Sequence, residues 1–261
     1  MSDWTKKLFI DHSSFFLKFM NLRWSRTEET VNGMIKVLGG YGVNSGNLLD
    51  LCCGNGRISV YMAKRGFRAV GVDMSKAFLE DARQKAKEHK VSKRVTFLEG
   101  DVRNLKKVVG KVSHPFDVVV TAWTSIGFST QDNDLKIFKQ ARELSKKGAL
   151  LVIAETMHSD YIALNFTPTS FDEIDNIVLM EKGTYDKTTS QMKTTWTYYN
   201  KRGEDLEFIG KVDIELHVYS VSELSALLRK AGWEPVAFYG SFATLQSFNP
   251  LTSLNLVAKA Q

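Results

Sequence analysis

Cysteine is nearly absent from this sequence of 261 residues, which contains only the adjacent pair Cys52 and Cys53. Neighbouring cysteines rarely form a disulfide, and two thiolates cannot complete a tetrahedral metal site. We therefore expect neither a disulfide framework nor a metal centre. Such low cysteine use fits a reducing compartment.

Long apolar runs are missing as well. No run approaches the roughly 18 residues that a membrane span needs. Near the N-terminus, Asp11 and His12 interrupt any apolar segment of a secretion signal. The expected location is the cytoplasm, without a membrane partner.

Long runs of one charge are also lacking, although the net charge is +6 and the isoelectric point is near 9.1. The longest basic clusters are pairs, at residues 106–107 and 146–147. Nucleic-acid-binding tails usually carry five or more like charges in a row. This pattern favours solvated helical surfaces, and a nucleic-acid partner stays open as the alternative.

Short apolar runs alternate with amphipathic segments after a helical N-terminal region. Apolar residues at helical spacing fill the first forty positions, and the glycines at 39, 40 and 42 end that region. The apolar runs that follow cover residues 48–52, 69–72, 95–98, 118–122 and 150–154. Five buried strands joined by helices predict right-handed βαβ units and a parallel sheet. The fold class is therefore α/β, with a helical cap over residues 1–44.

The alternation stops after residue 155. Residues 160–183 are expected to be irregular or partly helical, whereas 188–199 and 206–218 are rich in β-branched and aromatic residues and predict a long β-hairpin. A helix capped by Ser222 and two more strands follow. We expect a core of residues 1–159 and 219–261, interrupted by a lid or substrate-binding insertion of residues 160–218.

A turn with two glycines follows the first apolar run, in residues 48–57 (LLDLCCGNGR). Gly54 and Gly56 have no Cβ, so the backbone can turn sharply and a flat ligand can lie against it. In open α/β sheets, ligands bind beyond the carboxyl ends of the strands, beside a helix N-terminus. The dinucleotide fingerprint G-x-G-x-x-G is not met, because Arg57 and Ile58 follow Gly56, and no Walker lysine is present. The turn therefore predicts a nucleoside ligand without requiring a diphosphate.

Acidic residues end the next two expected strands. A carboxylate at Asp73 would accept hydrogen bonds from ribose hydroxyls. Met74 is placed to cover one face of an adenine, and Asp101 is placed to accept a hydrogen bond from its exocyclic amine. Because the carboxyl ends of parallel strands meet at one edge of a sheet, these side chains should converge with the glycine turn.

With these residues in place, the sequence resembles the class I S-adenosylmethionine-dependent methyltransferases. Residues 50–56 resemble the glycine-rich first motif, residues 116–123 (FDVVVTAW) the fourth-strand motif, and residues 147–151 (KGALL) the entry to the fifth strand. The similarity extends over residues 45–156 and, more loosely, over the last forty. It implies S-adenosylmethionine as cofactor and a Rossmann-like three-layer sandwich. The sheet would have seven mostly parallel strands in the order 3-2-1-4-5-7-6, with an antiparallel last strand.

The resemblance implies a set of cofactor-binding residues at the strand ends: Asp50, Cys52, Gly54, Gly56, Asp73, Met74, Asp101, Val102 and Thr121. Cys52 departs from the family, which most often has a glycine at that position, but its small side chain should fit. For Asp50, holding the backbone amides of the turn is an equal alternative.

The acceptor pocket is expected at the end of the fourth strand and on the hairpin, with the residues Trp123, Thr124, Ser125, Trp196 and Tyr198. Packing of the hairpin on the core is an equal reading for the last two. His158 follows the fifth strand and is the candidate general base, with a loop histidine of no catalytic role as the alternative.

The function that the resemblance implies is methyl transfer by in-line displacement to a nitrogen or oxygen of a small molecule. An RNA methyltransferase on the same fold is the first alternative, but residues 121–125 (TAWTS) differ from the Asn/Asp-Pro-Pro-Tyr type that resembles base-amine enzymes. A non-catalytic S-adenosylmethionine-binding protein and a nicotinamide-dependent dehydrogenase are the others. The sequence makes no prediction of oligomeric state.

Overall fold

The computed structural model describes residues 3–110, 112 and 115–261. Its helices are α1 (Asp3–Lys6), the π-helical turn η1 (Lys7–Asp11), α2 (Ser13–Leu22), α3 (Trp24–Gly40), α4 (Arg57–Lys64), α5 (Lys76–Glu88), the 3-10 turn η2 (Val102–Asn104), α6 (Leu105–Val109), α7 (Gln131–Glu143), α8 (Ser159–Asn165) and α9 (Val221–Lys230). Its strands are β1 (Asn47–Leu51), β2 (Arg68–Asp73), β3 (Val95–Glu99), β4 (Phe116–Ala122), β5 (Ser145–Thr156), β6 (Thr169–Ile174), β7 (Ile177–Asp186), β8 (Gln191–Arg202), β9 (Asp205–His217), β10 (Trp233–Ser241), β11 (Gln246–Ser247) and β12 (Leu254–Ala260).

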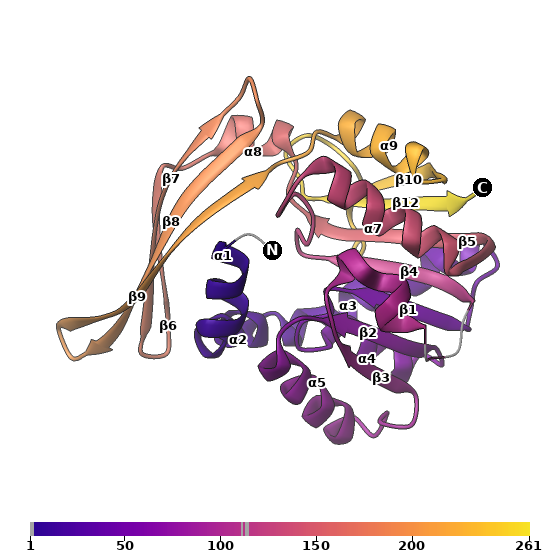
Figure 1. Ribbon diagram of the computed structural model, residues 1–261, viewed down its shortest axis with the longest axis horizontal. Helices are drawn as coiled ribbons and strands as arrows, with labels where there is room; N and C mark the ends of the chain where they lie inside the picture. Colours follow the sequence, from indigo (N-terminus) through magenta and orange to yellow (C-terminus); the bar gives the residue numbers. More distant parts are fainter. Residues whose placement is uncertain (1–2, 111, 113–114) are drawn as a thin grey trace.

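An eight-stranded sheet forms the core, in the order β11-β10-β12-β5-β4-β1-β2-β3 (Figure 1). Strands β1 to β5 pair in parallel, and β12 runs antiparallel to both β5 and β10. The predicted order 3-2-1-4-5-7-6 is confirmed, with β10 and β12 as the sixth and seventh strands. The predicted count of seven was one too low, because the two-residue strand β11 extends the edge.

Helices cover both faces of this sheet and make it the middle of three layers. The helices α6, α7 and α9 pack their apolar side chains on one face. The helices α3, α4 and α5 cover the other. Strand side chains such as Leu48, Val119 and Leu151 are fully buried between these layers, which explains why the strands read as continuous apolar runs.

The last helix begins two residues earlier than expected. Ser220, not Ser222, is its N-cap: the Ser220 hydroxyl accepts a hydrogen bond from the Glu223 amide, and the Glu223 carboxylate accepts one from the Ser220 amide. This reciprocal capping box satisfies two amides that the helix itself cannot.

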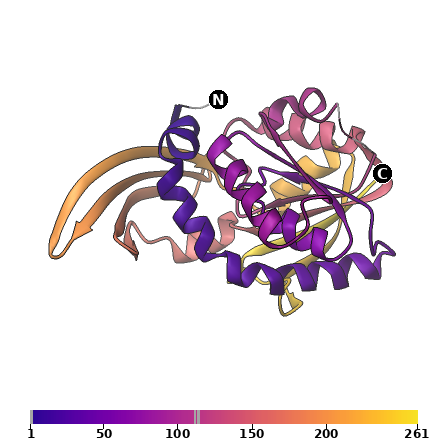
Figure 2. The same cartoon turned by 90° about the horizontal axis from the view of Figure 1, so that it is seen from below.

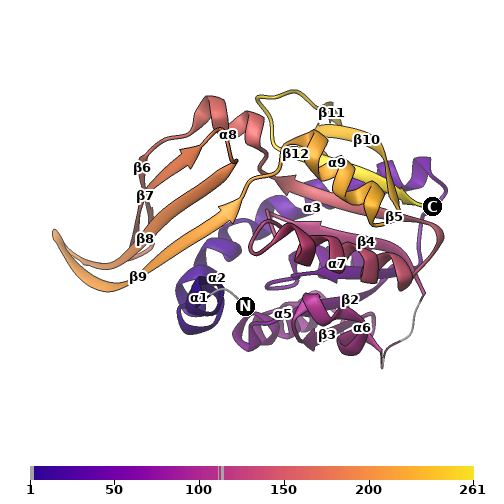
Figure 3. The ribbon, with the colours of Figure 1, turned by 45° about the horizontal axis from the view of Figure 1, so that its top comes forward.

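A second, four-stranded antiparallel sheet, β6-β7-β8-β9, projects from the core and is called the insertion sheet below (Figures 1 and 2). The expected hairpin is β8 and β9. For residues 160–183, expected to be irregular or partly helical, α8 confirms the helical part, whereas β6 and most of β7 were not predicted. Strand β6 is exposed along almost its whole length. Its sequence therefore lacks the alternation of apolar and polar residues from which a half-buried strand is predicted. The insertion sheet packs on the N-terminal helices, which lie between it and the core (Figure 3).

Candidate active site

The glycine turn at the end of β1 is held in a left-handed backbone conformation. The φ angles are +54° at Cys52, +53° at Gly54 and +74° at Gly56. Glycine adopts this region freely, whereas a cysteine there is strained, which is a physical reason for glycine to be common at the first position. Burial, together with nearby carboxylates led by Asp73, raises the pKa of the Cys52 thiol, so the side chain stays protonated and unreactive.

Asp73 ties this turn to the start of α5. One carboxylate oxygen, Oδ2, accepts a hydrogen bond from the Gly54 amide at 2.9 Å, and Oδ1 accepts one from the Ser75 amide at 2.9 Å. Burial raises the pKa of Asp73, and the hydrogen bonds from Ser75, Gly54 and Met74 oppose that rise. The prediction that β2 would bring this carboxylate to the glycine turn is therefore realised in the geometry.

Asp101 lies next along the same edge, because β3 pairs with β2 in the register Asp73 to Glu99. Its carboxylate is bonded by the Arg103 guanidinium at 2.5 and 2.9 Å and caps the turn that begins at Val102. The hydrogen bonds from Arg103 lower the pKa of Asp101, so this carboxylate stays charged. Its side chain is 30% exposed, so the carboxylate reaches the surface of this edge, although each of its oxygens already accepts from Arg103. Val102 is half-buried against the core.

Asp50 lies beneath the turn rather than at its surface. Its side chain is buried, and Oδ2 accepts hydrogen bonds from the Ser59 amide at 3.2 Å and the Ser59 hydroxyl at 2.7 Å. It therefore anchors α4 and does not contact the amides of the turn. Burial raises the pKa of Asp50 to about 7.

We expect Asp50 to make folding stability fall with rising pH. A carboxyl that binds its proton more tightly when folded favours folding below an ordinary pKa of 3.8, and this contribution is lost as the pH rises towards about 7. Asp50→Asn keeps an acceptor for Ser59 but does not titrate. Urea unfolding at several pH values between about 5 and 8 should show the wild type losing stability relative to this variant as the pH rises. Parallel curves for the two proteins would show that Asp50 does not titrate in this range.

The end of β4 is unusual in that Trp123 and Thr124 both have left-handed backbones, with φ of +59° and +54°. The turn is fixed by the Thr124 hydroxyl, which accepts from the Met157 amide, and by the Ser125 hydroxyl, which donates to the Ala122 carbonyl. Strained residues of this kind cluster at functional sites. Thr121 is buried beside Leu51, so β4 and β1 end together and Trp123 lies at the same edge as the glycine turn.

Helix α2, part of the N-terminal cap that the sequence predicts, lies over this edge, and the residues it brings there were not predicted. Phe16, Met20 and Arg23 have the i, i+4, i+7 spacing of one helix face. The Phe16 ring stacks on Trp123 with centroids 5.5 Å apart, and the Arg23 guanidinium lies 4.4 Å from the centroid of Trp123. The Sδ atom of Met20 is 2.9 Å from the position that a Cβ on Gly54 would take. The N-terminal helices thus close the glycine turn and Trp123 from one side.

A buried ion pair supports the same edge from below. Arg57 Nη2 lies 2.9 Å from Glu155 Oε2, and the two side chains are 7% and 26% exposed. Glu155 also accepts from the Thr30 hydroxyl, and Arg57 donates to the Thr27 hydroxyl, both on α3. These bonds fasten the end of β5 and the start of α4 to α3. Arg57 was noted in the sequence only as a residue that breaks the dinucleotide fingerprint.

The insertion sheet places Trp196 and Tyr198 on the face that contacts α2. Phe16 stacks on Trp196 at 6.1 Å and Phe15 on Tyr198 at 5.7 Å, so an aromatic path runs from Trp123 through Phe16 to the sheet. The Tyr198 hydroxyl is buried without a hydrogen-bond partner in the part of the chain that the structure describes. The hairpin β8–β9 therefore packs on the N-terminal helices, and these helices in turn contact Trp123 of the core.

Glu181 lies directly opposite Trp196 in the β7–β8 register and so shares this face. Burial, with Asp172 nearby, raises the pKa of Glu181, while a hydrogen bond from the Trp196 side chain opposes the rise. Within the described residues no lysine or arginine forms an ion pair with Glu181.

His158 is not placed as a general base should be. Its side chain is 0% exposed, and its Nε2 lies 2.9 Å from the Thr252 carbonyl, which can only accept, so Nε2 carries the proton. The ring packs edge-on against Phe248 at 5.1 Å. The side chain therefore holds the loop before β12 against β5, in agreement with the alternative of a loop histidine.

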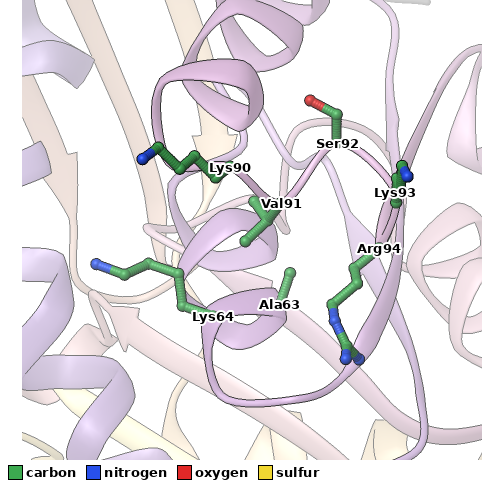
Figure 4. Close-up of a pocket in the computed structure, with 7 residues that line it drawn as sticks. All are labelled: Ala63, Lys64, Lys90, Val91, Ser92, Lys93 and Arg94. Carbon is green, nitrogen blue, oxygen red and sulfur yellow. The ribbon is translucent and has the colours of Figure 1, made fainter.

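A basic hollow of about 480 Å³ is found elsewhere, between the end of α4 and the start of β3 (Figure 4). Its lining includes Lys64, Lys90, Lys93 and Arg94. Lys64 lies 3.7 Å from Glu28, and Arg94 donates to the Gly66 carbonyl. The hollow is at the edge where β2 and β3 begin, opposite the glycine turn, so a polyanion bound there would not reach Trp123.

The described residues also provide no group of three or more histidine, cysteine, aspartate or glutamate side chains arranged to hold a metal ion. Among these residues, no helix has the length and hydropathy to span a membrane.

The three-layer sandwich, with a glycine turn and two acids at adjacent strand ends, defines the class I methyltransferase fold. A family model described as "Methyltransferase domain" matches residues 43–205, and the chain belongs to this family. It is an S-adenosylmethionine-dependent methyltransferase.

Three known proteins show how close the likeness is. The Bacillus subtilis (strain 168) protein named "Putative methyltransferase YqeM" is 28% identical over 193 residues, covering 72% of this chain and 74% of its own. An S-adenosylmethionine-dependent methyltransferase from Clostridium acetobutylicum superposes with a TM-score of 0.76 at 14% identity, covering 94% and 98%. The sugar N-methyltransferase KedS8 from a Streptoalloteichus species superposes with a TM-score of 0.67 at 16% identity, covering 89% and 87%.

The residues at the strand ends fit this cofactor. At Gly54 a Cβ would meet Met20 Sδ at 2.9 Å, so the turn has no room for a side chain, and the carboxylates of Asp73 and Asp101 lie along the same edge. An adenosine offers ribose hydroxyls and an exocyclic amine as donors, which match carboxylate acceptors in type.

Proposed function

We propose that this enzyme transfers the methyl group of S-adenosylmethionine to a nitrogen atom of a small molecule. The observation that supports nitrogen is the position of Glu181, a half-buried carboxylate without a cationic partner in the described residues, beside Trp196 and Tyr198. A carboxylate beside aromatic rings suits a neutral amine that donates a hydrogen bond, and it also stabilises the positive charge that develops on the nitrogen as the methyl group is transferred. The name of KedS8, a sugar N-methyltransferase with the same fold, agrees with this choice.

The bound cofactor would supply the electrophilic methyl group on its sulfonium. In this proposal Asp73 and the Gly54 turn hold the ribose, and Asp101 and Met74 hold the adenine. Thr121 and the residues 123–125 border the methyl group. Correct placement of nucleophile and methyl contributes roughly 7–11 kcal/mol to such reactions. A neutral amine needs no strong base, which fits the buried position of His158.

The insertion of residues 160–218 is proposed to cover the acceptor. Its inner face and α2 would exclude water from the transfer, and Glu181 would orient the acceptor by accepting a hydrogen bond from its N–H. Trp123, Thr124, Ser125, Trp196 and Tyr198 are proposed as residues of the acceptor pocket, with Trp196 and Tyr198 acting through contacts with Phe16 and Phe15.

The test is a transfer assay with methyl-labelled S-adenosylmethionine and three acceptor pools: small amines, small alcohols and total RNA. Label is expected in the amine pool, identified by mass spectrometry of the product. Label found mainly in alcohols or in RNA would contradict the proposal.

For the amine acceptor identified in this way, we expect Glu181→Gln to lower kcat/KM by about tenfold or more, since a charge-assisted hydrogen bond contributes roughly 1.5–3 kcal/mol. Its Kd for S-adenosylhomocysteine should be unchanged. Glu173→Gln is the matched control, because Glu173 is exposed and pairs with Lys201 at 2.7 Å. Equal kcat/KM values for the two variants would show that Glu181 does not contact the acceptor.

A further inference from the structure

The basic hollow between the end of α4 and the start of β3 is lined by side chains that donate hydrogen bonds. Its volume of about 480 Å³ lies within the range of roughly 300–1,000 Å³ that small-ligand sites occupy. The side chains of Lys64 and Lys90 extend towards the same side of it (Figure 4). Among the described residues that line it, none carries a carboxylate, and the polar ones are Lys64, Lys90, Ser92, Lys93 and Arg94. The hollow is therefore suited to an anion.

Lys90 has a backbone conformation that glycine adopts most readily. The Val91 amide donates to the Ala86 carbonyl at 2.9 Å, which is the long hydrogen bond of a Schellman motif at the end of α5. This motif places Lys90, directly after the C-cap His89, in the left-handed region with φ of +57°. Any Cβ is strained there. No hydrogen bond or ion pair joins the Lys90 ammonium to another described residue, so the fold itself gains no polar contact from the lysine. Strained residues of this kind cluster at functional sites.

The turn that follows Lys90 also has donors without partners. The amide and hydroxyl of Ser92, and the amide and ammonium of Lys93, form no hydrogen bond or ion pair within the described part of the chain. Arg94 uses Nη1 to donate to the Gly66 carbonyl at 3.3 Å, and its other guanidinium donors are available. Successive backbone amides beside cationic side chains form concave sites for phosphate groups.

The charge of the basic hollow indicates how many phosphate groups it would hold. Four cations line it, and only Lys64 has a carboxylate nearby, that of Glu28 at 3.7 Å, which also pairs with Arg65 at 3.0 Å. At least three positive charges are therefore not balanced. A single phosphate group carries a charge of about −1.5 to −2, and a second linked phosphate adds to it, so a diphosphate matches this excess.

We propose that the basic hollow binds the diphosphate group of a small soluble molecule of the nucleoside diphosphate class. The cations surround one hollow, which suits a compact anion better than an RNA strand, whose phosphates are spread along a track. The hollow is at the edge of the sheet opposite the glycine turn. Its occupancy is therefore independent of both the cofactor and the methyl acceptor.

The test is isothermal titration of the full chain saturated with S-adenosylhomocysteine, which keeps nucleotides away from the cofactor edge. The ligands are pyrophosphate, uridine diphosphate and, as the anion of lower charge, inorganic phosphate. Both diphosphates are expected to bind at least about tenfold more tightly than phosphate. Lys93→Gln should weaken both by at least about fivefold, because it removes a charge-assisted contact.

A glycine variant separates binding from folding. Lys90→Gly should also weaken both diphosphates by at least about fivefold, yet raise the melting temperature by about 2–4 °C, because glycine relaxes the left-handed backbone. A loss of binding in a more stable protein does not arise from misfolding.

Lys147→Gln is the matched control for charge. Lys147 is exposed, forms no ion pair with a described residue, and lies near the start of β5, three positions from β2 in the sheet order. This variant should bind both diphosphates as the wild type does. Three results would each overturn the proposal: equal weakening by Lys147→Gln, no binding of either diphosphate, or tighter binding of a short RNA oligonucleotide or of phosphatidylglycerol vesicles than of uridine diphosphate.

Discussion

Replacing Asp73 with alanine is expected to weaken binding of S-adenosylmethionine by at least about 100-fold. In the role proposed above, the carboxylate accepts hydrogen bonds from the ribose hydroxyls, and each such bond to a charged group contributes roughly 1.5–3 kcal/mol. The substitution also removes the acceptor that holds the Gly54 amide at 2.9 Å, so the turn itself loses its anchor. Isothermal titration below the melting temperature of the variant measures the loss.

Asp117→Ala is the control for this prediction. Asp117 also accepts from a backbone amide, that of Asn47 at 2.8 Å, but at the opposite edge of the sheet. Its loss should lower stability and leave the Kd for S-adenosylmethionine near the wild-type value. If Asp73→Ala bound the cofactor as tightly as Asp117→Ala, Asp73 would not be the ribose ligand.

Replacing Glu155 with glutamine is expected to destabilise the fold by about 3 kcal/mol, because it leaves the Arg57 guanidinium buried without a counter-charge. The side chain of glutamine keeps the shape and can still accept from Thr30, so the effect reports the charge. The measurement is the free energy of unfolding in urea.

An exposed pair provides the comparison. Glu143 lies 2.6 Å from Lys106, with both side chains more than half exposed, and Glu143→Gln should cost less than about 1 kcal/mol. The double variant Arg57→Met with Glu155→Leu should recover much of the lost stability, since it removes both buried charges. If Glu155→Gln and Glu143→Gln lowered the free energy of unfolding by similar amounts, burial would not increase the cost of breaking the Arg57–Glu155 pair.

The cofactor edge could be predicted from the sequence because a few local rules determine it. Parallel strands end at one edge, so acids that follow successive strands must converge, and Asp73 and Asp101 do. The glycine turn is similarly local, since positive φ at Gly54 and Gly56 is a property of those positions.

The sequence predicts a helical cap and an insertion, but it could not predict which residues they bring to the site, because those contacts are distant in sequence. The amphipathic sequence of α2 indicates that Phe16 and Met20 are buried. It does not indicate which surface of the protein they are buried against. Lys18 of α2, for example, bonds to Asn176 across 158 positions of the sequence. His158 was misjudged for a related reason. Its position after β5 was correct, but the left-handed backbone at Glu155 and the loop with Thr252 decide where its side chain points.

Strand β12 is made after both of its neighbours, yet it fills the space between β5 and β10. Until residues 254–260 have left the ribosome, β5 and β10 each expose an unpaired edge. The core on the two faces of the sheet also lacks the side chains of β12, such as Leu256 and Val257, which are buried in the folded protein. Unpaired edges of this kind invite association with other chains. The nascent protein therefore depends on rapid closure of a long-range contact once β12 has emerged, the step at which a chaperone would have its largest effect on yield.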